Sequence, residues 1–98
     1  MEFEWDERKR ETNLAKHRVD FIDAVIMFDG VILEAEDERR DYGERRFRAL
    51  GVVKGQVLHV VYTLRHSRRR IISARKAGHH EQKAYYAHLR GRGEEDER

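Results

Sequence analysis

Three segments rich in β-branched residues follow one another between residues 45 and 76, and only short turn signals separate them. Strands are predicted at 45–53, 56–64 and 69–76, with Lys54-Gly55 as the first turn and the residues around 66–68 as the second. Because such short connections join only antiparallel neighbours, the three strands are expected to form a meander. The most apolar segment, 56–64, is expected at its centre.

The remaining segments predict helices on both sides of this meander. Asp6 caps a helix at about 7–17, and Asp20 caps a second one whose apolar residues recur at helical spacing. Short strands are predicted at 3–5 and 31–35, and a last helix at 81–89. This order predicts an α+β fold, with two N-terminal helices and one C-terminal helix packed on a twisted, mainly antiparallel sheet.

Length and composition predict one small domain in the cytoplasm. The chain has 98 residues and no cysteine, which fits a single domain at 1–90 in a reducing compartment. Residues 91–98 are rich in glycine and acids and are expected to form a disordered acidic tail. The acidic N-terminus does not resemble a signal peptide, and the longest apolar stretch, 24–28, is too short to span a membrane.

The segment 62–76 is strongly basic and contains no acidic residue. Its cations are Arg65, Arg68, Arg69, Arg70, Arg75 and Lys76. Arginines held on strands suit phosphate, because the planar guanidinium can donate two hydrogen bonds to phosphate oxygens. From charge, a nucleic-acid surface and a plain solvated surface are equally consistent with this segment.

Strand alternation selects which side chains can act together. In 56–64, Tyr62 is expected to face away from His59 and Arg65. In the last strand one expected face carries Ile71, Ser73 and Arg75, and the other carries Arg70, Ile72, Ala74 and Lys76. Polar groups among apolar neighbours at strand ends make Tyr62, Arg65, Arg70, Ser73 and Arg75 candidates for a small site.

Each candidate also has a purely structural interpretation. The pattern favours Tyr62 as a core tyrosine with a bonded hydroxyl, and Arg75 could equally form a salt bridge with Glu44 or Glu81. His17, beside Lys16, could accept a proton near neutral pH, or it could interact with the exposed carbonyls at a helix end. The histidines at 79–88 lack metal-ligand spacing, so neither a metal nor a cofactor is predicted.

Four groups of residues, in this order, resemble the BrnT toxin family. They are Phe3-Glu4-Trp5-Asp6 with Lys9, Asn13 and Lys16-His17; Asp41-Tyr42-Gly43-Glu44 with Arg46; Val60-Val61-Tyr62-Thr63; and Arg70 through Ala77 with Glu81. The resemblance covers about residues 3–86. Arg18 departs from it, because the family usually has glycine after Lys-His.

The resemblance implies a RelE-like fold and a ribonuclease toxin of a type II toxin–antitoxin system that cleaves RNA and arrests translation. It also implies neutralisation by a BrnA-type antitoxin with a ribbon-helix-helix domain. Operator DNA would then be contacted only through the antitoxin, in a dimer or a heterotetramer with it. The RNA could be free or could be messenger RNA on the ribosome.

RNA can be cleaved without a metal if a base, a phosphate clamp and a proton donor are present. We expect Arg65 and Arg75 to clamp the phosphate with help from Arg46. His17 or Glu44 would be the base, and Tyr62 or Lys16 would orient or protonate. Expected RNA contacts are Lys9, Lys16, Arg68, Arg69, Arg70 and Lys76.

A different class of function fits the same residues. The basic hairpin could hold RNA or an antitoxin without breaking a bond, and the chain would then act as a transcriptional corepressor. In that case reversing charges would abolish binding, whereas replacing His17, Tyr62 or Glu44 would change little.

Overall fold

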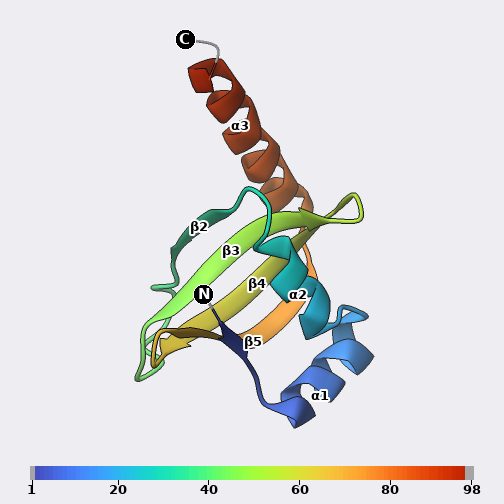
Figure 1. The fold of residues 1–98 in the computed structure, drawn as a ribbon, viewed down its shortest axis with the longest axis vertical. Helices are drawn as coiled ribbons and strands as arrows, with labels where there is room; N and C mark the ends of the chain where they lie inside the picture. The colour runs from blue at the N-terminus through green and yellow to red at the C-terminus, as the bar shows by residue number, and fades with distance from the viewer. Residues whose placement is uncertain (1, 97–98) are drawn as a thin grey trace.

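The computed structural model describes residues 2–96 and contains one five-stranded sheet in the order β1-β5-β4-β3-β2 (Figure 1). The elements are β1 (Phe3–Glu4), α1 (Glu7–His17), α2 (Phe21–Met27), β2 (Leu33–Glu36), β3 (Arg46–Val53), β4 (Gln56–Arg65), β5 (Arg68–Lys76) and α3 (His79–Asp96). β1 runs parallel to β5, and the other neighbouring strands are antiparallel. The predicted α+β class and the order of the helices are confirmed.

Two tight turns connect the three long strands, as predicted. Lys54 and Gly55 have φ of 51° and 78°, and His66 and Ser67 have φ of 51° and 65°. Two successive left-handed residues are typical of the two-residue hairpin turn whose twist matches that of the flanking strands. The meander therefore follows from local turn chemistry.

The main core lies between α2 and one face of the sheet. Phe21, Met27, Val60 and Ile71 are almost completely buried there. A Cβ at Gly51 would collide with the Met27 side chain, so glycine at this position of β3 allows α2 to approach closely. A smaller cluster on the other face includes residues of α3 as far as Leu89, and the rest of that helix projects away from the sheet (Figure 1).

A β-bulge in β5 changes which residues share a face. Tyr62 pairs with Ile71 and Val61 pairs with Ser73, so Ile72 is an extra residue in the ladder. The predicted alternation of β5 is therefore wrong beyond this point. Ala74 lies in the main core together with Ile71, whereas the predicted alternation put these two residues on opposite faces of the sheet.

The bulge brings three polar residues of β5 to the face away from α2. Arg70 pairs with Thr63, and Ser73 and Arg75 continue on the same side after the extra residue. The alternation had placed Arg70 on the opposite face from the other two. A simple period of two cannot reveal an inserted residue, because a bulge depends on how two strands pair.

α3 is longer than predicted. The sequence indicated a helix at 81–89 and a disordered tail at 91–98, whereas α3 runs from His79 to Asp96. Each glycine in the interior of a helix costs only about 1 kcal/mol, and extending an existing helix is much easier than starting one. Residues 97–98 lie outside the described residues.

Asn13 fastens α1 to the edge of the sheet. Its side-chain amide donates to the carbonyls of Ala74 and Val19 at 2.7 and 2.9 Å, and its carbonyl accepts from the Ala74 N–H at 3.1 Å. β1 pairs with β5 only at Arg69 and Arg70, so the edge beyond them lacks a strand partner. Asn13 takes the place of that strand at Ala74.

Asn13→Ala is expected to lower the free energy of unfolding by about 2–4 kcal/mol, because the buried Ala74 backbone groups lose their partners. Urea denaturation measures the change. Thr12→Ala, an exposed neighbour on the same helix, should change stability by less than about 0.5 kcal/mol. Equal stabilities of the two variants would contradict this role of Asn13.

Arg18→Gly is expected to raise the free energy of unfolding by up to about 1 kcal/mol. Arg18 has φ of 59° and ends α1 in the left-handed conformation, which strains any residue with a Cβ. Thermal and urea unfolding test this. Arg8→Gly inside the same helix should instead destabilise by about 1 kcal/mol, and destabilisation by both changes would show that the strain at Arg18 is negligible.

Candidate functional site

One face of the sheet, opposite α2, carries six arginines; Arg68 lies at the turn beside Arg65, and we name the other five the arginine face. They are Arg46, Arg48, Arg65, Arg70 and Arg75. Arg46 and Arg70 both pair with Thr63, one from each side, so the three form a row across β3, β4 and β5. A second row consists of Arg48, Val61 and Ser73. Because strands hold these side chains, the positive groups occupy defined positions.

Glu44 anchors two of these arginines. Its carboxylate accepts from Arg46 Nε at 3.0 Å and lies 3.9 Å from an Arg65 guanidinium nitrogen. The Arg46 guanidinium also covers the Tyr42 ring at 4.3 Å from the ring centroid. Glu44 therefore positions cations, and one of its oxygens already accepts a hydrogen bond from Arg46.

Carboxylates also hold Arg70 and Arg75. Arg70 pairs with Glu4 of β1 at 3.1 Å, and Arg75 pairs with Glu81 of α3 at 2.8 Å. Among the described residues, Arg48 has no carboxylate partner within salt-bridge distance. Within residues 2–96, Arg48 is thus the one arginine of this face that no acid neutralises.

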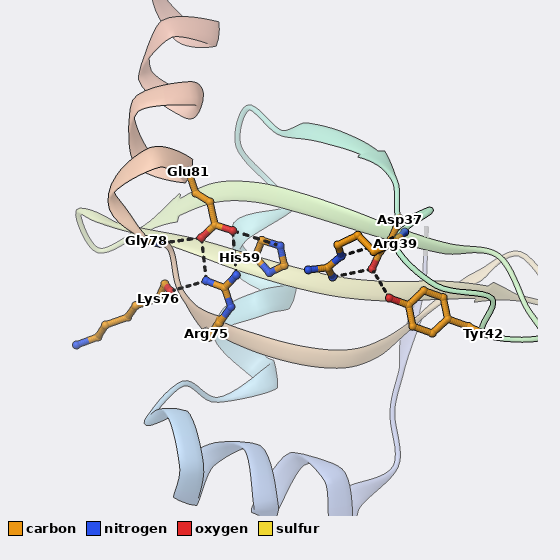
Figure 2. A network of polar contacts seen from close by, with 8 residues as sticks. All are labelled: Asp37, Arg39, Tyr42, His59, Arg75, Lys76, Gly78 and Glu81. Atoms are coloured by element: carbon orange, nitrogen blue, oxygen red, sulfur yellow. Dashed lines mark hydrogen bonds and ion pairs between the residues drawn. The ribbon is translucent and has the colours of Figure 1, made fainter.

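Glu81 is the centre of the contact between β5 and α3 (Figure 2). Arg75 donates to both of its oxygens, at 2.8 and 2.9 Å, and the Gly78 N–H donates at 2.7 Å. These hydrogen bonds, above all those of Arg75, lower the pKa of Glu81 to about 2. Arg75 therefore holds the start of α3 against β5, and it is also a member of the arginine face.

His59 lies beside this ion pair and was missed as a candidate. It is only 5% exposed, and its Nε2 is 3.7 Å from the Glu81 carboxylate. Its Nδ1 is buried without a hydrogen-bond partner among the described residues. Burial and the nearby Arg75 lower the pKa of His59, so the ring is neutral near pH 7. In the sequence, His59 is a single polar residue within an apolar strand, and no motif or spacing marks it as a functional residue.

A cleft of about 360 Å³ lies between α1 and β5, and we name it the α1–β5 cleft. Its walls include Lys9, Lys16 and His17 of α1 and Ser73 of β5. Neither lysine has a salt bridge among the described residues. Ser73 also lies on the face opposite α2, so the cleft reaches the edge of that face at this residue.

Arg70 links the two regions further. Asp6 also lines the α1–β5 cleft, and the pKa of its carboxyl group is lowered. The main causes are hydrogen bonds from the backbone N–H groups of Lys9 and Arg8, and the positive charge of Arg70 contributes to a smaller extent. The structure therefore places Lys9, Lys16 and His17 in one cleft beside β5, and Ser73 in that cleft lies on the face that carries the arginines.

Tyr62 lies on the other face of the sheet. It is 4% exposed, its hydroxyl donates to Glu34 at 2.6 Å, and its ring stacks on Phe47. Burial is the main cause of its raised pKa. These contacts are those of a core tyrosine, the interpretation that the sequence pattern favoured.

The remaining basic residues expected to contact RNA are not gathered at the cleft. The Arg69 guanidinium lies over the Phe28 ring at 4.4 Å from its centroid, on the α2 side. Arg68 pairs with Glu2 at 2.9 Å near the turn, and Lys76 is exposed at the far end of β5. None of the three is placed to act with His17.

A cation-lined cleft that opens onto a sheet of fixed arginines defines a small α+β domain suited to hold a polyanion such as RNA. The family described as "Ribonuclease toxin, BrnT, of type II toxin-antitoxin system" matches residues 5–81, and the chain belongs to this family. It is therefore a toxin of a type II system, with an antitoxin and RNA as partners. No curated protein matches the sequence closely enough to be reported as a relative.

Two further features of residues 2–96 concern membranes and metals. No helix in this range is both long and apolar enough to cross a membrane. In the same range, no three histidine, cysteine, aspartate or glutamate side chains are grouped so that they could hold a metal ion.

Glu81→Gln is expected to destabilise the fold at pH 7 by about 1–3 kcal/mol, because the charged hydrogen bonds with Arg75 are weakened. The pKa of Glu81 falls from an ordinary 4.5 to about 2 on folding. Its carboxylate thus stabilises the fold above pH 4.5, and this contribution disappears as the pH falls toward 2.

Urea unfolding of both proteins between pH 2 and pH 7 measures this effect. The gap between wild type and Glu81→Gln should close at the acid end, whereas Glu11→Gln on the exposed face of α1 should show no gap. A difference that stays constant across the pH range would contradict an ionic origin.

Proposed function

We propose that this toxin is a metal-independent endoribonuclease that acts where the α1–β5 cleft opens onto the arginine face. One observation carries the proposal. His17 is half-buried in the same cleft as the unpaired Lys9 and Lys16, and Ser73 joins that cleft to the arginine face. A proton acceptor and the cations that hold a phosphate are thereby side by side.

The reaction is an attack of the RNA 2′-hydroxyl oxygen on the adjacent phosphorus. His17 accepts the hydroxyl proton, the bond to the 5′-oxygen breaks, and Lys16 protonates that leaving oxygen. The products are a 2′,3′-cyclic phosphate and a 5′-hydroxyl. His17 suits the base better than Glu44, because Glu44 already accepts from Arg46 and lies close to Arg65.

The arginine face stabilises the charge that develops on the phosphate. Arg46 and Arg70 flank Thr63 and are held by carboxylates, so they need little rearrangement when the RNA binds. Arg65, more exposed, extends this surface toward the neighbouring phosphate. Arg75 acts as a positioning residue through its contact with Glu81.

The antitoxin is proposed to be of the BrnA type and to neutralise the toxin by covering this cationic surface. A partner segment rich in acidic residues would occupy the positions of the RNA phosphates and exclude the substrate. Operator DNA would be bound through the antitoxin, in a dimer or heterotetramer. The complex would act in the cytoplasm.

His17→Ala is expected to lower the rate of RNA cleavage by about 10²–10⁴-fold, because the general base is lost. Cleavage of naked RNA in EDTA and of messenger RNA in a translation mixture measures the rate, and mapping of fragment ends identifies the cyclic phosphate. Growth arrest after induction should disappear in parallel.

His88→Ala on α3 is the matched control and should keep the activity of the wild type. Cleavage that continues undiminished in His17→Ala would remove this residue from the site. A strict requirement for a divalent metal on naked RNA would overturn the metal-independent mechanism. Arrest of growth with no cleaved RNA would favour a non-catalytic binder.

A further inference from the structure

A second cavity, of about 380 Å³, lies at the other end of the arginine face, between β2, β3, β4 and the start of α3. We name it the β2–α3 cavity. Its walls are mostly apolar and include Leu33, Leu50 and Ala84. The proposed reaction uses none of these three apolar residues, so the apolar part of the cavity requires a separate explanation. Its size falls in the range of sites that hold small organic groups.

Among the polar side chains that line this cavity, Arg48 and His59 each carry a group without a partner among the described residues. Arg48 has no carboxylate neighbour, although other arginines of the same face do. The Nδ1 atom of His59 is buried and makes no hydrogen bond. A buried polar atom without a partner is uncommon and costs roughly 1–3 kcal/mol, which a bound group with a matching edge would recover.

The cavity lies close to the α1–β5 cleft. Arg48 borders the cavity, Ser73 borders the cleft, and both pair with Val61 in one row across the sheet. Two strand spacings of about 4.8 Å separate Arg48 from Ser73, a span of the order of 10 Å. One RNA strand crossing the sheet can therefore reach both places.

We propose that the β2–α3 cavity is a nucleobase pocket for the RNA held in the α1–β5 cleft, and that Arg48 and His59 select guanine there. This inference rests on the proposed function for the identity of its ligand. The apolar walls suit the faces of a base. Binding of a base next to the reacting nucleotide would give the toxin a sequence preference.

The hydrogen-bonding groups favour guanine over the other bases. The Arg48 guanidinium can donate to O6 and N7 of guanine together, a pair of acceptors that adenine does not offer. His59 Nε2 faces the Glu81 carboxylate at 3.7 Å, which favours the tautomer with its proton on Nε2. Nδ1 is then an acceptor for a guanine N–H group.

The test measures binding of 2′-O-methyl tetranucleotides, which lack the attacking hydroxyl and cannot be cleaved by the proposed mechanism. The strands carry guanine, adenine, uracil or cytosine at one position in turn. Wild-type toxin should bind a guanine strand at least about tenfold more tightly at one position, as a bidentate arginine contact predicts. Arg48→Gln and His59→Gln should each remove most of that preference.

Two matched variants separate this inference from the proposed reaction. His79→Gln, which lies on α3 outside the cavity lining, should keep the guanine preference. His17→Ala should also keep the guanine preference while losing cleavage, because His17 lies in the α1–β5 cleft and not in the β2–α3 cavity. Circular dichroism checks that each variant is folded, and Arg48→Gln remains informative if His59→Gln is not.

Equal affinity of the wild-type toxin for all four bases at every position would overturn the nucleobase pocket. A guanine preference that survives in folded Arg48→Gln would overturn the assignment of Arg48. Neither result bears on the reaction, which the His17→Ala cleavage rates test separately. Conversely, an active His17→Ala toxin with an intact guanine preference would remove the proposed base and leave the pocket in place.

Discussion

The pairing of the Asn13 amide with Ala74 is the contact on which the proposed site depends. It satisfies the backbone of β5 where β1 no longer does, and it holds α1 against the edge of the sheet. Lys16 and His17 follow on the same helix, so their positions relative to Ser73 depend on this one side chain. The Asn13 amide bonds both the backbone N–H and the backbone carbonyl of Ala74. This makes the position of α1 specific, because its displacement would leave these two buried backbone groups without a hydrogen bond.

Ion pairs shape the cationic surface as much as the cations do. Glu44, Glu4 and Glu81 hold Arg46, Arg70 and Arg75 at distances of 2.8–3.1 Å. Such pairs reduce the net charge of the surface, and they also fix guanidinium groups that would otherwise move freely. Lys9, Lys16 and Arg48, which have no ion-pair partner in the described part of the chain, lie in the α1–β5 cleft and at the β2–α3 cavity. Both places could therefore bind a phosphate or a base edge without first breaking an internal salt bridge.

Much of the fold could be predicted from local signals. The two turns with left-handed residues, the caps Asp6 and Asp20 and the β-branched segments each act over a few neighbouring residues, and all of these elements are present. The prediction of β5 was wrong after Ile72, because a bulge depends on how two strands fit together. α3 extends beyond its predicted end at residue 89, because the cost of two glycines within a helix is small compared with the ease of extending a helix that has already formed. The faces of Tyr62 and Arg65 on β4 were correctly separated by alternation, which is also a local property.

The sequence by itself determined the α+β class, the meander, the basic character of β5 and, through family motifs, the class of toxin. Only the tertiary structure decided which charged groups face one another. Arg75 could have paired with Glu44 or Glu81, and only the packing of α3 on β5 selects Glu81. His59 became a candidate only when its burial, its unpaired Nδ1 and the cavity beside it were known. The physical reason is the same in each case: turns and caps act between near neighbours in the chain, whereas burial and ion pairing join residues that are distant in it.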